Sequence, residues 1–369
     1  MSLKRIVIKI GTNVLQQTNG KLDYKLISEL TAQIARIRSN GHEVLLVSSG
    51  SVGAGRELCS VDESGNTLAS HQILASVGQA KLIQIYSDSF RKHKTTVAQI
   101  LLTRGDFGLR KSYLNIRNTL ENLLKYRIVP VVNENDVVAT EELDLNFGDN
   151  DLLAVYLATL IGADQLFFLT VAPGLLKEVE TAQGKQSKVV AKVEKLTEEI
   201  VQHCLPFTSA GGKGGMESKV RSAGMAMSFG IDTYIIDGKF PAGVFEIMEG
   251  RPLGTHFVAH GRKIRSYQKW LAAGALNKGT LIIDQGAEQA LLKNKKSLLA
   301  RGVARVEGQF EDKDLVEIHN LEGVKLGVGR ADCSAKELRY QIKERNLTNS
   351  KVNTRSGKPV IHRNHLFLE

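Results

Sequence analysis

The first 260 residues alternate short runs of β-branched and aliphatic residues with longer amphipathic segments, and this alternation restricts the possible folds more than any other feature. The strand-like runs RIVIKI (residues 5–10) and EVLLVSS (43–49) flank a segment, 24–41, in which apolar residues recur at helical spacing. Strands joined through helices run parallel, and the helices then cover both faces of the sheet. The sequence therefore predicts an α/β domain with an open, mostly parallel sheet sandwiched by helices.

The same alternation continues along the chain. Further strands are expected at 96–103, 128–133, 165–170 and 232–237, and further helices at 70–93, 113–127, 150–162 and 216–230. Gly41 follows the first long helix, and we expect it to adopt the left-handed conformation that ends many helices.

The pattern changes after about residue 262. A connector is expected at 263–273, and beyond it lie short alternating strands at 279–286, 302–310, 314–320 and 325–331, with one helix at 289–300 and a polar C-terminal tail. We therefore predict two domains. An α/β domain spans residues 1–262, and a small β-rich domain with the polar tail spans 274–369.

Composition narrows the class of protein and its partners. The chain has 369 residues and a formal net charge of +10, which suits an anionic ligand or nucleic acid equally well. No stretch approaches the roughly 20 apolar residues of a membrane helix, and no signal peptide is expected. The three cysteines are far apart, which argues against a disulfide framework or structural zinc. A cytoplasmic protein that contacts no membrane is expected.

Polar residues and glycines follow two of the predicted strands. Lys9 and Gly11 lie at the end of the first, and Ser49 and Gly50 end the second. Ligands of an open parallel sheet bind beyond the carboxyl ends of its strands. A lysine in an apolar strand is costly unless it meets an anion, although a solvated strand end would also explain Lys9. Capping of the following helix would explain Ser49 without a ligand.

Two further groups of residues suggest a ligand. The stretch AGGKGGMESK (210–219) places Lys213 and Lys219 in a glycine-rich approach to a helix, where phosphate could rest on backbone amides. A surface loop is the simpler interpretation. The other group collects carboxylates and amides, namely Asn133, Asn135, Asp136, Asp149, Asn150 and Asp151. Such a group could recognise an ammonium group, bind a magnesium ion, or hold nearby lysines in place.

Several common catalytic motifs are missing. The sequence has no GxxxxGK[ST] loop, and no GxGxxG follows the first strand. It also has no serine-centred elbow and no HExxH. These absences exclude a Walker loop and a dinucleotide fingerprint from consideration.

Taken together, these motifs resemble the amino acid kinase family, and within it the glutamate 5-kinases. The matching motifs are VIKIGTNVL, SSGSVGAGRE, LLTRGDF, VVNENDVVAT, FGDNDLLA and GGKGGMESK, in the order and spacing of the family. The resemblance covers nearly the whole chain. The segment after about residue 273 resembles a PUA domain, a small β-barrel-like fold that often binds RNA.

The resemblance assigns roles to individual residues. It implies that Lys9 and Lys219 stabilise the transferring phosphoryl group and that Asp151 orients them. It implies a substrate site made of Ser49, Gly50, Asp136 and Asn150, and it assigns no residue directly to a metal. The ATP-contacting residues that it implies are Lys9, Gly11, Thr170, Val171, Gly212, Lys213, Gly214, Gly215, Met216, Glu217 and Ser218.

The resemblance also implies a reaction and its partners. ATP, with Mg²⁺, would phosphorylate the side-chain carboxylate of L-glutamate to γ-glutamyl phosphate, the first step of proline biosynthesis. A reductase of the glutamate-5-semialdehyde dehydrogenase type would receive this unstable product. Feedback inhibition by proline and a homo-oligomeric state are implied by the family as well.

The chain departs from the pattern of the family at four positions. Val171 and Pro173 lie in LTVAPGLL, where the family usually has aspartate after LT in a TDxxGL pattern. Lys213 replaces the threonine of a GTGGM loop, and Asn118 stands where aspartate is common. We expect an active kinase with altered nucleotide affinity.

Two alternatives remain open at the level of sequence. One is a kinase of the same fold that acts on another carboxylate, such as aspartate or acetylglutamate. The other is a protein with weakened catalysis that has an RNA-binding or regulatory role. RNA binding is the weaker interpretation, because aromatic residues suited to base stacking are sparse in the C-terminal domain.

Overall fold

The computed structural model describes residues 3–62, 67–108, 110–138, 150–181, 184–202, 215–260, 277–348 and 358–368. The chain divides into two compact units. The first comprises residues 1–103 and 114–263, and the second comprises residues 104–113 and 264–369. The predicted boundary at 262 stays a prediction, and the predicted connector at 263–273 lies outside the described residues.

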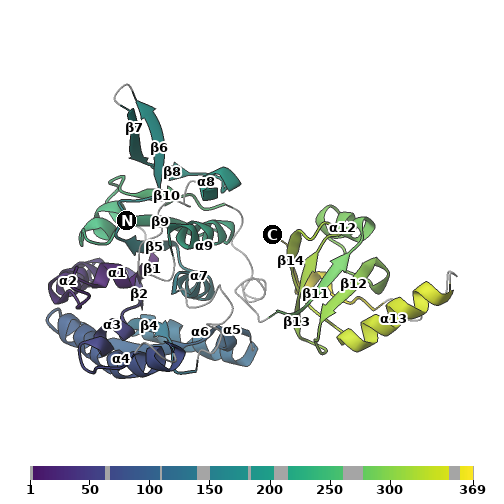
Figure 1. The fold of residues 1–369 in the computed structure, drawn as a ribbon, viewed down its shortest axis with the longest axis horizontal. Helices are drawn as coiled ribbons and strands as arrows, with labels where there is room; N and C mark the ends of the chain where they lie inside the picture. Colours follow the sequence, from purple (N-terminus) through teal and green to yellow (C-terminus); the bar gives the residue numbers. More distant parts are fainter. Residues whose placement is uncertain are drawn as a thin grey trace. The chain divides into compact units, whose positions relative to one another are not determined.

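The first unit contains an open, mostly parallel sheet, as predicted (Figure 1). Its strands in spatial order are β3 (Val97–Leu102), β4 (Val129–Glu134), β2 (Glu43–Ser48), β1 (Arg5–Ile10), β5 (Gln165–Thr170), β9 (Asp232–Asp237), β10 (Thr255–Phe257) and β8 (Lys192–Val193). The first six of these strands run parallel to their neighbours, whereas β10 is antiparallel to β9 and the short β8 is parallel to β10.

Helices cover both faces of this sheet (Figure 1). The described helices before residue 260 are α1 (Thr12–Leu15), α2 (Tyr24–Ser39), α3 (Ser51–Arg56), α4 (Thr67–Arg91), α5 (Arg104–Gly108), α6 (Arg110–Lys125), α7 (Asn150–Ile161), α8 (Glu198–Gln202), α9 (Met216–Ser228) and α10 (Gly243–Met248). The side chains of α2, α4 and α10 join one core cluster with Ile6, Ile8 and Ile10 of β1. Since side chains alternate along a strand, Lys9 of β1 projects to the other face, where α7 and α9 pack.

The ends of α2 show how local sequence sets the boundaries of a helix. The Asp23 side chain accepts a hydrogen bond of 3.0 Å from the backbone N–H of Leu26 and caps the N-terminus. Gly41 has φ of +95°, which confirms the predicted left-handed turn after the helix. The helix buries Leu26, Leu30 and Ile34 at the spacing expected of one amphipathic face.

A hairpin of β6 (Leu176–Thr181) and β7 (Gly184–Val189) follows β5 and stands out from the first unit in Figure 1. The sequence analysis did not predict it. Its strands carry lysine, glutamate and glutamine side chains that are mostly exposed, so neither face shows the apolar alternation by which a half-buried strand is recognised.

The second unit contains a five-stranded sheet, which confirms the predicted β-rich character. Its strands in spatial order are β12 (Val303–Gly308), β11 (Asn277–Ile283), β13 (Leu315–His319), β14 (Lys325–Arg330) and β15 (Leu366–Leu368). The unit also contains α12 (Gln285–Leu292), α13 (Ala335–Thr348) and two short 3₁₀ turns, η2 (Ala300–Gly302) and η3 (Arg363–His365). It has its own buried core, which includes Leu281, Val316 and Leu338.

Three details of the second unit differ from the prediction. The helix expected at 289–300 begins at Gln285, where Asp284 caps it through Ala287 N–H, and it ends at Leu292. The helix α13 was not predicted, because its mostly polar sequence shows little amphipathic pattern. The polar tail ends in β15, which pairs with β14 and buries Leu366.

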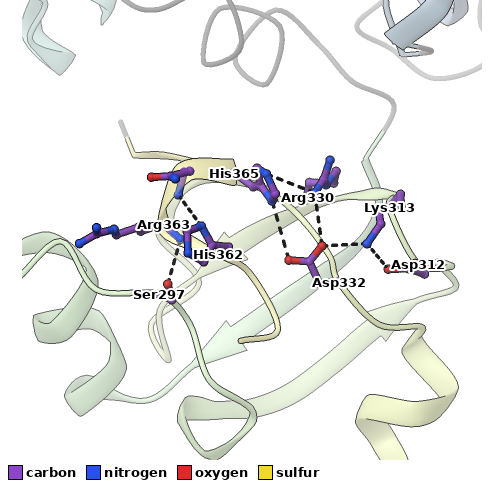
Figure 2. Close-up of polar contacts among 9 residues, drawn as sticks. Ser297, Asp312, Lys313, Arg330, Asp332, His362, Arg363 and His365 are labelled. Carbon is purple, nitrogen blue, oxygen red and sulfur yellow. Dashed lines mark hydrogen bonds and ion pairs between the residues drawn. The ribbon is translucent and has the colours of Figure 1, made fainter. Parts of the chain in front are cut away.

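A polar cluster surrounds Asp332, two residues after the end of β14 (Figure 2). Its carboxylate accepts hydrogen bonds from Lys313 Nζ at 3.0 Å and from Arg330 Nη2 at 3.4 Å. Arg330 Nη2 also lies 2.8 Å from Nδ1 of His365, which precedes β15. Burial and the Arg330 guanidinium lower the pKa of His365 from its ordinary value, against the opposing effect of Asp332.

We predict that His365 titrates below pH 6.5 in the folded protein. An unfolded chain takes up this proton near pH ~6.5, so the stability associated with neutral His365 is present above that pH and is lost as the pH falls below it. NMR titration of the histidine ring protons, with His365→Asn to identify the signal, measures the midpoint. Arg330→Met is expected to raise it. A midpoint at or above 6.5 in the wild type would contradict the prediction.

Candidate functional site

The strands whose ends carry predicted site residues are neighbours in the order β4, β2, β1 and β5. Their carboxyl ends therefore meet at one edge of the sheet, where ligands of such sheets bind. The residues at this edge are Asn133 in β4, Ser49 after β2, Lys9 in β1 and Thr170 at the end of β5.

A buried ionic triad lies on the face of the sheet that α7 and α9 cover. Nζ of Lys9 is 2.6 Å from Oδ1 of Asp151, and Nζ of Lys219 is 3.0 Å from Oδ2 of the same carboxylate. The side chains of Lys9, Lys219 and Asp151 are 5%, 7% and 0% exposed. Sequence analysis named all three, and the fold brings them together although 210 positions separate the two lysines (219 − 9). Their catalytic roles stay a proposal.

The triad carries one unit of net positive charge, because two ammonium groups share one carboxylate. Burial by itself would raise the pKa of Asp151, but the charges of Lys9 and Lys219 outweigh burial and lower it. Asp151 is also in the first turn of α7, where the helix dipole favours a negative charge. The carboxylate is therefore ionised at neutral pH, and the excess positive charge can be balanced by an anionic ligand.

A chain of hydrogen-bonded side chains lies beside the triad. Asn150, the neighbour of Asp151, donates from Nδ2 to Ser49 Oγ at 2.9 Å and to Asn133 Oδ1 at 3.1 Å. Asn133 donates in turn from Nδ2 to Oε1 of Gln79 in α4 at 2.9 Å. Oδ1 of Asn150 is buried and has no hydrogen-bond partner among the described residues. This atom therefore keeps an unused capacity to accept a hydrogen bond.

The turn between β2 and α3 brings Gly50 and Asp136 into the same neighbourhood. Gly50 has φ of +109°, a conformation that residues with a Cβ rarely adopt, and it precedes the first residue of α3. Ser51 donates from Oγ to Oδ2 of Asp136 at 3.1 Å. The four predicted substrate residues thus occupy connected positions around the ends of β2 and β4 and the start of α7.

The predicted ATP contacts fall into three places. Gly11 follows β1, and its N–H donates to the carbonyl of Leu169 at 3.3 Å. Thr170 ends β5, and Val171 follows it. Gly215 precedes α9, and Met216, Glu217 and Ser218 form its first turn before Lys219. Gly212, Lys213 and Gly214 lie outside the described residues.

Comparison with known proteins gives the family. The model of the amino acid kinase family matches residues 4–237, and the model of the PUA domain matches residues 279–350. The chain belongs to the amino acid kinase family. The glutamate 5-kinase of Dehalococcoides mccartyi strain CBDB1 is 38% identical over 370 residues, which cover 99% of this chain and 98% of that protein. The glutamate 5-kinase of Chlorobaculum tepidum is 39% identical over 368 residues, which cover 99% and 97%.

The structure places three of the four departures from the pattern of the amino acid kinase family. Val171 is 47% exposed at the end of β5, beside the residues expected to contact the nucleotide, and Pro173 lies in the turn that follows. Asn118 lies within α6. Lys213 lies outside the described residues.

The part of the chain that the structure describes contains no group of three histidine, cysteine, aspartate or glutamate side chains placed to hold a metal ion. The carboxylate of Asp151 is occupied by two lysines. Among the described residues, this donor set does not form a metal site. Among the described helices, none is both long and apolar enough to cross a membrane.

Sequence reasoning missed several residues that support this site. Asn133 was noticed only as a member of a polar group, Gln79 was given no role, and the contact of Ser51 with Asp136 was not foreseen. Gln79 lies in the middle of a long helix, far in sequence from every motif. The sequence contains no signal for it, since only the packing of α4 against α3 shows what its side chain contacts.

We predict that Asp151→Asn destabilises the fold by about 3 kcal/mol, because it leaves two buried ammonium groups without a counter-charge. Urea unfolding at pH 7 measures the change. Asp88→Asn is the control, since Asp88 pairs with Arg91 on the exposed surface of α4 and its loss costs at most about 1 kcal/mol. Equal midpoints for Asp151→Asn and the wild type would show that the triad does not stabilise the fold.

Proposed function

We propose that this chain catalyses the transfer of the γ-phosphoryl group of ATP to the side-chain carboxylate of L-glutamate. The observation that carries the proposal is the buried Lys9–Asp151–Lys219 triad beside the Asn150 and Ser49 side chains. Full-length similarity to proteins named glutamate 5-kinase supports the choice of substrate.

The reaction needs no general base. A glutamate side chain has a pKa of ~4.3 in its unperturbed state, so it is already an anionic nucleophile at pH 7. The carboxylate oxygen attacks the γ-phosphorus, and ADP leaves with the bonding electrons. The protein therefore has to position two anions and stabilise the charge that spreads over the phosphoryl oxygens.

The triad is suited to that electrostatic task. Two ammonium groups held by one carboxylate leave positive charge for the phosphoryl group, and their burial strengthens the interaction. Asp151 is proposed to fix the two Nζ atoms before the substrates bind, so that little reorganisation is needed during the transfer. Lys9 comes from a strand and Lys219 from a helix, and their common partner sets the distance between them.

The remaining residues are proposed to hold the two substrates. Ser49, Gly50, Asp136 and Asn150 would bind glutamate, with carboxylate and amide oxygens facing its ammonium group. Gly11, Thr170, Val171 and the residues from Gly212 to Ser218 would contact ATP, as the family resemblance implies. Mg²⁺ would be carried by the phosphates of ATP, because the described side chains do not form a metal site of their own.

Further features of the proposed function come from the resemblance. The product would enter proline biosynthesis through a reductase of the glutamate-5-semialdehyde dehydrogenase type, proline would inhibit the enzyme, and the active form would be a homo-oligomer. We place the reaction in the cytoplasm, because widely spaced cysteines fit a reducing compartment. The alternative of a regulatory or RNA-binding chain with weakened catalysis is not favoured, since the triad is intact.

The direct test is release of ADP that depends on glutamate, with hydroxylamine present to trap the acyl phosphate as a hydroxamate. Aspartate and acetylglutamate, offered in parallel, separate a glutamate kinase from a kinase for another carboxylate. Absence of hydroxamate with all three substrates would refute the proposed function.

We predict that Lys9→Ala and Lys219→Ala each lower kcat about a hundredfold or more, because each removes one donor of positive charge from the transition state. The hydroxamate assay measures the loss, and circular dichroism checks that the fold is retained. Arg91→Ala, on the exposed end of α4, is a charge-matched control that is expected to keep full activity. Wild-type turnover in either lysine variant would exclude that lysine from the reaction.

Val171→Asp tests the missing carboxylate of the nucleotide site. We predict that the wild type is active and that Val171→Asp lowers the KM for Mg-ATP with kcat changed less than about threefold, because a carboxylate there adds a ligand for the ion that ATP carries. Initial rates over a range of Mg-ATP concentrations measure the change. An unchanged KM would show that position 171 does not affect nucleotide binding.

A further inference from the structure

Three side-chain amides form a directed chain from the surface helix α4 to the substrate site. Gln79 Oε1 accepts from Asn133 Nδ2, and Asn133 Oδ1 accepts from Asn150 Nδ2. The second N–H of Asn150 donates to Ser49 Oγ, so the donors of Asn150 are used within the protein. What remains is Oδ1 of Asn150, a buried acceptor without a partner among the described residues.

The direction of this chain determines what Asn150 offers to a ligand. An amide group has an acceptor on one side and donors on the other, so turning Asn133 over would present its N–H to Asn150. Asn150 would then have to turn its own carbonyl toward Asn133. Its N–H groups would face the ligand, and a donor there would repel an ammonium group instead of binding it.

The position of Gln79 is fixed by the residue before it. A Cβ on Gly78 would lie 1.8 Å from the carbonyl oxygen of Ser51 and 2.3 Å from the backbone nitrogen of Gly55, so α4 crosses α3 at a distance that only glycine permits. Farther along α4, Tyr86 Oη lies 2.7 Å from Oγ of the buried Ser48 at the end of β2. Two contacts thus hold α4 against the segments that carry the substrate residues.

We propose that Gln79 is a positioning residue that gives the enzyme its selectivity for a substrate with an α-amino group. Its Oε1 acceptor sets the direction of the amide chain and thereby leaves Asn150 Oδ1 to accept from the substrate ammonium. Gln79 itself touches no substrate. The inference rests on the proposed function, and it adds a residue outside the family motifs to the determinants of specificity.

The test compares L-glutamate with glutarate, which has the same two carboxylates and lacks the amino group. Both give hydroxamates in the trapping assay. Gln79→Met removes the acceptor at nearly constant size and charge, and we expect the ratio of kcat/KM for glutamate over glutarate to fall about tenfold. The loss is expected in the KM for glutamate, with kcat and the values for glutarate little changed.

Gln84→Met is the matched control. It makes the same substitution on the same helix, and Gln84 is exposed and donates to Asp88 on the surface of α4. We expect wild-type selectivity from this variant. Gln79→Glu supplies a second test if Gln79→Met folds poorly. A carboxylate can only accept at this position, so the selectivity ratio is expected to stay at or above that of the wild type.

The outcomes separate the inference from the proposed function. A wild type that forms no hydroxamate from glutamate overturns both. A wild type that is active on glutamate, together with an unchanged selectivity ratio in Gln79→Met, overturns only the role of Gln79. An equal loss of kcat/KM for both substrates in Gln79→Met does the same, because it marks a general structural defect. A ratio that falls in Gln79→Glu as far as in Gln79→Met also rejects the assigned role.

Discussion

The site depends on one carboxylate that holds two ammonium groups away from water. Asp151 is fully buried between Lys9 and Lys219, and removing its carboxylate would leave two ammonium groups without a counter-charge in the interior. The β1 strand, α7 and α9 each contribute one member of this triad. The two ion pairs of the triad therefore fix the relative positions of these three elements. The geometry that we propose for phosphoryl transfer is at the same time a contact that stabilises the fold.

Around the triad, the residues proposed to bind the two substrates lie at the ends of different strands. The ends of β2 and β4, with the start of α7, present hydroxyl, amide and carboxylate groups suited to a small polar substrate. The ends of β1 and β5 and the start of α9 present backbone groups and lysines suited to phosphates. Lys9 lies in β1, just before Gly11, and Asp151 directly follows Asn150 in α7. The ion pair between Lys9 and Asp151 therefore joins the two sets of residues. A phosphoryl group passing from one substrate to the other would cross the region of excess positive charge.

The helix α4 shows that support for a site can come from a segment without any motif. Gly78 permits close contact with α3, Tyr86 hydrogen-bonds the end of β2, and Gln79 begins the amide chain that ends at Asn150. These contacts use ordinary residue types in a long helix. Their effect depends on where the helix packs, so the acceptor that we propose for the substrate ammonium is set by tertiary packing.

The sequence alone determined the fold class and the order of the main strands and helices along the chain, because alternating strand and helix periodicity is a local pattern. It also singled out Lys9, at the end of an apolar strand, and Lys219, beside a glycine-rich stretch, whereas the grouping of these lysines with Asp151 came from the family resemblance. It did not predict the β6–β7 hairpin or α13, whose polar sequences carry weak periodicity. Only the tertiary structure decided that Lys9 and Lys219 share one carboxylate and that Gln79 reaches Asn133. Such contacts join residues far apart in the chain, and no local pattern encodes which long-range partners the packing of helices on a sheet will bring together.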